Sequence, residues 1–171
     1  AEVEGSRAVR ALAAEVDLPW DANADGRVDD DEGERDYAFV THATGGLLVF
    51  DLTRRAEPQL VSRIRLPLVA LGVAVDRSRM RAYISGASGG LAIVDLAALA
   101  TATLVDADVN GVDDRVLEVV PIPAIQPGSP AVVLPDLGLV FVGGDGGAAG
   151  IQVGAPAIVF VRADGSGEVL H

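Results

Sequence analysis

Apolar residues along the chain fall in short runs rich in Val, Ile, Leu and aromatic side chains, and Gly, Pro or Asp bounds each run. This pattern is typical of β-strands. Two runs, LLVF (47–50) and LAIV (91–94), are apolar at every position. Both faces of these strands are therefore expected to be buried, as they would be in sheets stacked face to face.

The strand-like runs recur three times in the same order. The first unit contains the runs 13–17, 36–41, 45–52 and 60–67. The second contains 72–76, 81–86, 89–96 and 116–123, and a more divergent third contains 131–136, 139–144, 157–165 and 168–170. The repeat predicts an all-β protein of three four-stranded antiparallel units.

We expect the 171 residues to form a single segment of repeated units without an internal domain boundary. The units span 8–67, 68–123 and 129–171. Each carries one long interruption: insertions at 18–36 and 101–115, and a Gly-rich loop at 143–156.

Three stretches carry a resemblance to known repeats. GGLLVFDLTRRAEPQLVSRIRLP (45–67) and GGLAIVDL (89–96) resemble the LVIVD-type β-propeller repeat, and VAVDRSRMRAYISG (73–86) is similar to YVTN-type blades. The resemblance implies β-propeller blades. It is weaker in the third unit, where Arg162 replaces the aspartate found at Asp51 and Asp95. The strand pattern alone also allows a β-sandwich or a β-helix.

Three blades are too few for a closed propeller, which has at least about four. An open arc would leave two apolar blade faces exposed. We expect the ring to be completed by further blades of a longer chain or by a second copy in a homo-oligomer. The opening AEVEGSRAV, in place of a start Met, favours an excised or processed segment.

The stretch DANADGRVDDDE (21–32) matches the spacing of an EF-hand calcium loop. Calcium needs six to eight oxygen ligands, and alternate residues of a tightly wound loop point inward. Gly26 is placed for the turn. The expected ligands are Asp21, Asn23, Asp25, the Arg27 carbonyl, Asp29 and Glu32.

The surroundings of this loop differ from those of an EF-hand. Pro19 disfavours an incoming helix, and strand residues resume at Tyr37. The loop resembles the helix-poor calcium loops of dockerins and of FG-GAP propeller blades. We therefore interpret it as an insertion in the turn between two strands that is ordered by calcium, rather than a calcium sensor.

A second, weaker candidate is DADVNGVDD (106–114), with Gly111 at the turn. Its twelfth position is Leu117, so a closing Glu is missing unless Glu118 shifts into place. We expect one Ca²⁺ at the first loop. The second loop either binds a second Ca²⁺ or is an Asx-rich turn without metal. The expected ligands are Asp106, Asp108, Asn110, the Val112 carbonyl and Asp114. Both loops are predicted on the same face of the blades.

The composition of the chain disfavours several classes of partner and site. The net charge of −12, from 25 acidic and 13 basic residues, disfavours nucleic acid, whose binding rests on clustered basic side chains. No apolar run reaches the length of a membrane span. Without cysteine, the chain has no disulfide, no thiolate metal site and no cysteine nucleophile.

Together these features predict a calcium-stabilised scaffold of an exported bacterial protein, which is secreted, periplasmic or at the cell surface. Its role would be binding or adhesion, with a protein or glycan as ligand. One alternative is a propeller enzyme of the lactonase or quinoprotein kind, for which His42 with Thr41 and Asp145 is an acid–base candidate. Another is self-assembly into a dimer or polymer through open blade faces.

Overall fold

The computed structural model describes residues 9–19, 34–44, 46–87, 90–97, 106–122, 131–142 and 157–170. These residues form three four-stranded antiparallel sheets, and the only helical element among them is the 3₁₀ turn Pro135–Leu137. The prediction of an all-β chain with three four-stranded units is confirmed. Within the described ranges the three sheets do not close into a ring.

Each sheet is a meander in which neighbouring strands follow one another in sequence. The first sheet consists of β1 (Val9–Pro19), β2 (Glu34–His42), β3 (Gly46–Asp51) and β4 (Gln59–Ile64). The middle sheet consists of β5 (Ala70–Asp76), β6 (Arg81–Gly86), β7 (Gly90–Asp95) and β8 (Val116–Pro121). The last sheet consists of β9 (Ala131–Leu134), β10 (Leu139–Val142), β11 (Ala157–Val161) and β12 (Gly167–Leu170).

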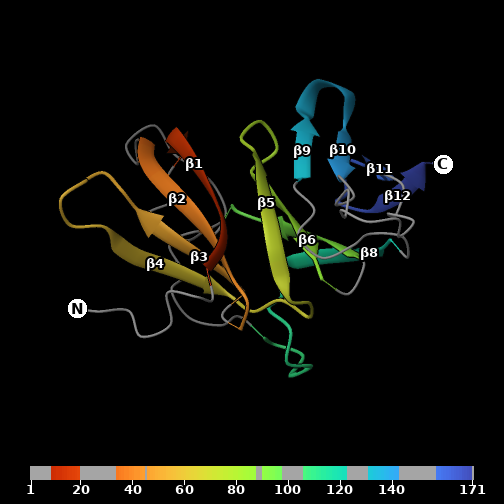
Figure 1. The fold of residues 1–171 in the computed structure, drawn as a ribbon, viewed down its shortest axis with the longest axis horizontal. Helices are drawn as coiled ribbons and strands as arrows, with labels where there is room; N and C mark the ends of the chain where they lie inside the picture. Colours follow the sequence, from red (N-terminus) through yellow and green to blue (C-terminus); the bar gives the residue numbers. More distant parts are fainter. Residues whose placement is uncertain are drawn as a thin grey trace, which may run out of the picture.

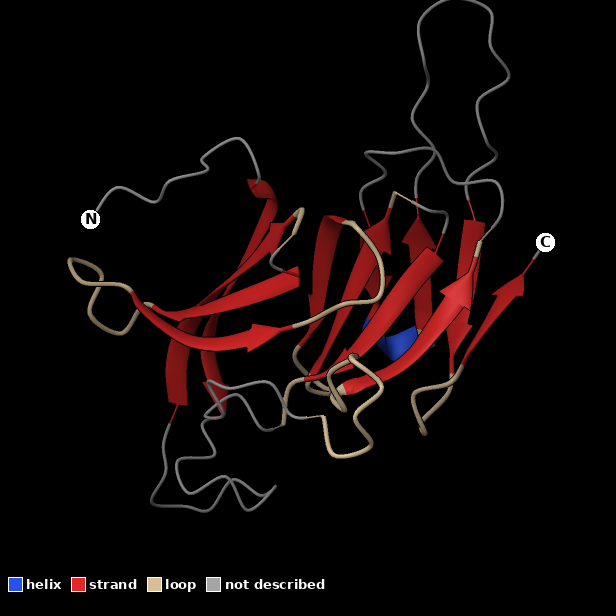
Figure 2. Ribbon diagram, turned by 90° about the horizontal axis from the view of Figure 1, so that it is seen from below, coloured by secondary structure: helices blue, strands red, loops and turns tan. Residues whose placement is uncertain are grey.

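The first and last sheets lie on opposite sides of the middle sheet (Figure 1). The first strands of successive sheets are neighbours, since β5 contacts β1 on one side and β9 on the other. The fourth strands β8 and β12 also contact each other. Figure 2 shows the strands, in red, standing side by side, and the 3₁₀ turn, in blue, which joins β9 to β10. The sheets therefore pack face against face, like successive blades.

Two apolar layers hold the sheets together. One lies between the first and middle sheets and the other between the middle and last sheets. The alternation of side chains along β6 supplies both, because Ala82 and Ile84 belong to the first layer and Tyr83 to the second. All six residues of β6 are buried. The inner strands β6 and β7 are thus covered on both faces, as the apolar run 91–94 predicts. The same prediction is wrong for the run 47–50, where Leu48 and Phe50 of β3 are only partly buried.

Sheets one and two repeat each other in detail, and their first strands show it. β1 and β5 each carry a register irregularity at the same place. There the backbone N–H of Ala11 donates to the Thr41 hydroxyl over 2.9 Å, and that of Gly72 donates to the Ser85 hydroxyl over 3.1 Å. A hydroxyl on the second strand thus satisfies an amide that the bulge removes from the ladder.

The third strands end in the same way. Asp51 at the end of β3 accepts the backbone N–H of Thr53 over 2.8 Å, and Asp95 at the end of β7 accepts that of Ala97 over 2.9 Å. This Asx turn stops the strand by giving the backbone a side-chain partner. β2 and β3 therefore correspond residue for residue to β6 and β7, with Asp51 matching Asp95.

The hairpin between β2 and β3 depends on one glycine. Gly46 has φ +75°, and a Cβ built there would lie 2.1 Å from the Ile64 carbonyl oxygen. Gly90, the matching residue of the middle sheet, is not in this conformation, and its nearest neighbour would lie at 3.4 Å. The tight approach of β3 to β4 therefore requires glycine at position 46.

Candidate metal site

The acidic loop 106–114, which precedes β8, winds around the side chain of Asp106. One oxygen of Asp106 accepts the backbone N–H of Asn110 and the other accepts that of Gly111, each over 2.9 Å. Gly111 has φ +84°, a conformation that glycine adopts without strain. The turn glycine predicted from sequence thus lies where the loop reverses.

Further side-chain contacts to the backbone complete the winding. Asp108 accepts the backbone N–H of Asn110 over 3.1 Å, and Asn110 in turn accepts that of Val112 over 2.7 Å. Asp114 closes the loop by accepting the backbone N–H of Ala107 over 2.8 Å. Alternate side chains therefore turn toward the interior of the loop, as the spacing predicts.

This winding brings three carboxylates together. One oxygen from each of Asp106, Asp108 and Asp114 lies within 4.8 Å of the other two. In the described part of the chain no basic side chain forms an ion pair with any of them. A group of carboxylate oxygens without nitrogen or sulfur donors suits a hard divalent cation. The cluster can hold a metal ion.

The remaining predicted ligands stand as follows. The Asn110 side-chain oxygen is engaged with the Val112 amide, and Leu117 at the twelfth position is 40% exposed on β8. Glu118 does not shift toward the loop, because its carboxylate accepts the backbone N–H of Gly167 on β12. The first calcium loop, with Asp21, Asn23, Asp25, Arg27, Asp29 and Glu32, lies outside the described residues, so its ligand set stays a prediction.

A buried ion pair anchors the end of the acidic loop. Arg115 donates from Nε and Nη2 to the two oxygens of Asp113, both over 2.7 Å, and the exposed fractions of the two residues are 7% and 1%. The same guanidinium donates to the Ser62 hydroxyl over 2.7 Å and to the Arg63 carbonyl over 3.2 Å. Ser62 and Arg63 belong to β4, so Arg115 joins the loop to the first sheet.

Sequence reasoning missed this anchor. Asp113 and Arg115 stand between the loop and β8 in the run DDRVLE, which looks like ordinary polar surface. Their partners on β4 are more than fifty residues away. The available signal was an aspartate and an arginine two residues apart, directly before a strand.

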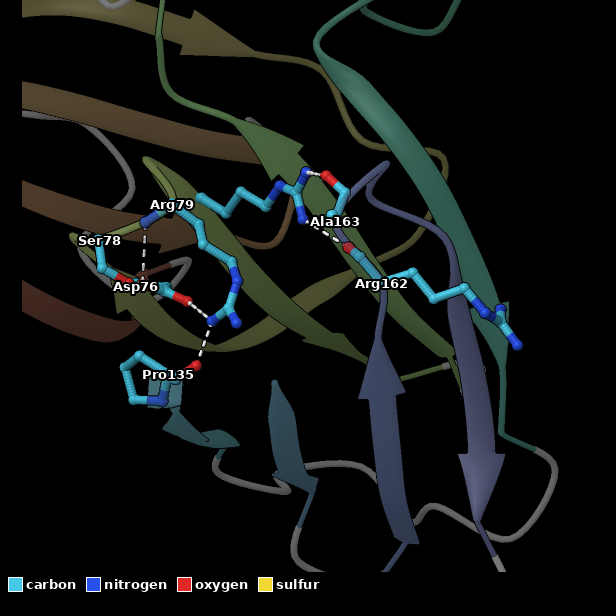
Figure 3. A network of polar contacts seen from close by, with 7 residues as sticks. Asp76, Ser78, Arg79, Pro135, Arg162 and Ala163 are labelled. Atoms are coloured by element: carbon cyan, nitrogen blue, oxygen red, sulfur yellow. Dashed lines mark hydrogen bonds and ion pairs between the residues drawn. The ribbon is translucent and has the colours of Figure 1, made fainter. Parts of the chain in front are cut away.

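Two more arginines join the middle sheet to the last one (Figure 3). Arg79 donates to Asp76 over 2.9 Å and to the Pro135 carbonyl. Arg81 donates to the carbonyls of Arg162, over 2.9 Å, and Ala163. The Pro135 and Arg162 carbonyls also accept the backbone N–H groups of Gly138 and Gly165, so each arginine binds a turn that follows a strand of the last sheet.

Asp76 and Asp51 both ionise more readily than ordinary aspartates. Burial alone would raise the pKa of Asp76, but hydrogen bonds from Ser78 and Arg79 outweigh it and hold the pKa below its usual value. Burial would likewise raise the pKa of Asp51, but hydrogen bonds from Thr53 and Arg35 outweigh it and lower that pKa. Both aspartates are therefore charged structural acceptors at neutral pH.

A cleft of about 380 Å³ adjoins the ion pair between Arg35 and Asp51, whose Nη1 and Oδ2 atoms are 2.7 Å apart. Its lining is strongly polar: Glu34, Arg35, Asp51, Thr53, Arg54, Glu57 and Gln59. Mixed charges of this kind do not select a ligand class.

His42, the acid–base candidate, accepts the backbone N–H of Thr44 through Nδ1 over 3.3 Å and so caps its own turn. Asp145 lies outside the described residues.

The chain matches no protein-family model, and no curated protein sequence matches it. The resemblance to LVIVD and YVTN repeats thus stays a prediction from the sequence. Among the described residues no helix is long and apolar enough to cross a membrane. Interpretation of the site rests on its own geometry.

Proposed function

We propose that this chain is a calcium-binding β-propeller module whose packing is stabilised by the metal and which serves for binding rather than catalysis. The observation that carries the proposal is the cluster of Asp106, Asp108 and Asp114 in an EF-hand-like spacing. Three consecutive meander sheets packed face to face support the propeller architecture. An exported bacterial setting is part of the proposal, because helix-poor calcium loops suit the millimolar calcium found outside cells.

The route from metal to stability runs through the anchor next to the loop. Calcium would neutralise the mutual repulsion of the three carboxylates, which otherwise opposes the wound loop. Asp113 lies beside Asp114, and Arg115 reaches from there to Ser62 and Arg63 on β4. A loop fixed at this end holds Arg115 in place across the boundary between the first and middle sheets. Metal binding is therefore expected to stabilise the packing of two sheets and not only a surface turn.

Isothermal titration with Ca²⁺, with Mg²⁺ as a comparison, tests the proposal. We expect calcium binding in the wild type, and saturation at 100 times Kd should add about 2.7 kcal/mol to the free energy of unfolding. The double variant D106N/D108N should lose one binding event, and D21N/D25N should lose the other if both loops bind. Asp136→Asn, at an exposed aspartate of the 3₁₀ turn, is the matched control and should change neither.

The readouts separate the parts of the proposal. If D106N/D108N binds as many ions as the wild type, the cluster is not a calcium site. An identical melting temperature in calcium and in chelator would contradict the stabilising role.

A further inference from the structure

In the part of the chain that the structure describes, no sheet packs on one apolar face of the first sheet. Strand register places Leu12, Val40 and Leu48 in one row of this face and Ala14, Ala38, Phe50 and Leu60 in the next. Leu12 is 63% exposed and Leu60 is 44% exposed. We call this surface the leading face.

The last sheet has a second apolar face on which none of the described sheets packs, and we call it the trailing face. Its exposed side chains come from all four strands: Val132, Leu134, Phe141, Phe160 and Leu170. Their exposed fractions run from 36% at Phe141 to 57% at Val132. Contiguous apolar surface of this kind marks an interaction site.

The repeat shows that the leading face is built to receive a preceding sheet. Ala38 and Val40 on this face correspond to Ala82 and Ile84 of the middle sheet. Ala82 and Ile84 belong to the apolar layer against the first sheet, so their positions are covered by the preceding sheet. Among the described residues no sheet lies in front of these positions in the first sheet; Ala38 and Val40 are themselves buried, and the exposed apolar side chains of this face are those of Leu12 and Leu60.

The trailing face is the opposite kind of surface. Phe160 corresponds to Val49 in the first sheet and Ile93 in the middle sheet. Val49 packs toward the middle sheet and Ile93 packs toward the last one, and both are fully buried. Phe160 thus occupies the position that a following sheet covers, yet it is 38% exposed.

Polar residues on the fourth strands follow the same rule. Ser62, Glu118 and Glu168 lie opposite the equivalent residues Val49, Ile93 and Phe160. Ser62 accepts Arg115 of the next sheet, and Glu118 accepts the backbone N–H of Gly167 of the next sheet. The third member, Glu168, is exposed, and its ion pair among the described residues is with Arg162 of its own sheet.

Charge favours contact between unlike faces. Arg63 ends the row of the leading face that contains Leu48, and Glu168 ends the row of the trailing face that contains Phe160. Both are exposed and both lie on a fourth strand. Glu168 already pairs with Arg162 of its own sheet, and Arg63 of an opposing leading face would add a second cation to that carboxylate, whereas two leading faces would bring two Arg63 side chains together.

We propose that the trailing face of one copy of this chain docks on the leading face of a second copy, in the relation that the middle sheet has to the last one. This head-to-tail contact buries on each copy the faces that the internal sheet boundaries already bury. Two copies that make the contact twice form a closed ring, and a rotation that does not close yields a polymer. The inference does not depend on the metal site.

Sedimentation equilibrium of the 171-residue chain over a range of concentrations tests this proposal. The wild type should reach at least twice the 17.5 kDa chain mass. Leu12→Asp on the leading face and Phe160→Asp on the trailing face should each weaken association at least about tenfold, because both place a charge inside an apolar contact. Val109→Asp, at a residue that is 85% exposed in the acidic loop, should leave association unchanged.

Mixing the two variants distinguishes the head-to-tail arrangement from others. Each mixed pair retains one intact contact, between the trailing face of L12D and the leading face of F160D. The mixture should therefore return to the dimer mass, while either variant alone stays monomeric. Circular dichroism establishes that each variant is folded, and L60D with V132D serves as a second pair if one is not.

Three results would overturn the proposal. One is a wild type that stays at 17.5 kDa at every concentration, which would assign the open faces to blades of a longer chain. Another is association that only one of the two variants disrupts, which would mean pairing of like faces. The third is a mixture that stays monomeric. Loss of calcium binding without any change in mass would count against the proposed function alone.

Discussion

The middle sheet and its two neighbours share one repeat pattern and differ in what covers them. Ile93 in the middle sheet is fully buried, whereas its counterpart Phe160 in the last sheet is 38% exposed. Val94 of the middle sheet is likewise fully buried, while Phe50 at the same place in the first sheet is only partly covered. The pattern is therefore that of a sheet with a neighbour on each face, and within the described ranges only the middle sheet has both.

Polar contacts across the sheet boundaries repeat this difference. Arg115 of the middle sheet's β7–β8 connection reaches the first sheet, and Arg79 and Arg81, at the start of β6, reach the last sheet. Arg35 of the first sheet and Arg162 of the last sheet pair with acids of their own sheets. Variants that affect the two classes of position unequally test the comparison.

The largest effect is expected when the buried anchor loses one partner. Asp113→Ala leaves the Arg115 guanidinium buried without its carboxylate, which should lower the free energy of unfolding by about 3 to 5 kcal/mol. Urea unfolding followed by circular dichroism measures it. Arg55→Ala is the control, because Arg55 is 84% exposed and 3.6 Å from Asp36, and it should cost less than about 1 kcal/mol. Equal losses in the two variants would show that the anchor holds no sheets together.

A matched pair of truncations compares a covered position with an open one. Ile93→Ala should cost about 2 to 5 kcal/mol, because it opens a cavity between the middle and last sheets. Phe160→Ala, at the equivalent position, should cost less than about 1 kcal/mol in protein dilute enough to be monomeric. Similar values for the two would mean that Phe160 is covered within a single chain.

The two corresponding hairpin glycines should respond differently to the same change. Gly46→Ala places a methyl group 2.1 Å from a backbone oxygen at positive φ, so we expect a loss of at least about 2 kcal/mol. Gly90→Ala, where the contact is 3.4 Å, should cost about 1 kcal/mol or less. Thermal unfolding of both variants measures the difference. If G90A proves the more destabilising, the close approach of β3 to β4 is not what position 46 serves.

The smallest effect is expected in how the free energy of unfolding of the wild type and of two aspartate variants depends on pH. Asp76 has a lowered pKa in the folded protein, so its stabilisation is present above the ordinary aspartate pKa of about 4 and is lost as the pH falls through the lower folded value. Asp76→Asn should flatten the decline of stability in acid, measured by urea unfolding at several pH values. Asp51→Asn should flatten it too, since the pKa of Asp51 is also lowered.

Of these two variants, only Asp76→Asn should also loosen the last sheet, because Asp76 orients Arg79 toward Pro135. Hydrogen exchange in β9 and β10 measures that difference. Curves that run parallel to the wild type in both variants would contradict the assigned pKa shifts.

Much of the fold could be predicted because the strands follow local rules. The run 81–86 is β6 without any change of bounds, and 116–123 differs from β8 only at its end. β1 was predicted as 13–17 but begins at Val9, because pairing with β2 extends it over residues that are not a continuous apolar run. Strand cores were thus visible in the sequence, while strand ends depended on neighbours.

The candidate site divides in the same way. Asp106, Asp108 and Asp114 were predicted from spacing, since a loop of nine residues determines its own winding. Arg115 could not be assigned a role, because that role depends on Ser62 and Arg63 of another sheet. Glu118 was considered as a ligand, but its partner Gly167 is recognisable only once β8 and β12 lie side by side.

The meander order of the sheets also bears on how the chain assembles. Every strand pairs with its neighbour in sequence, so each sheet can form from hairpins before the sheets meet. Within the middle sheet, residues 87–89 join β6 to β7, whereas residues 96–115 join β7 to β8. The longer closure costs about 1 to 2 kcal/mol more in chain entropy. We expect β8 to be the last strand of its sheet to join, and an acidic loop already wound before that moment would shorten the search.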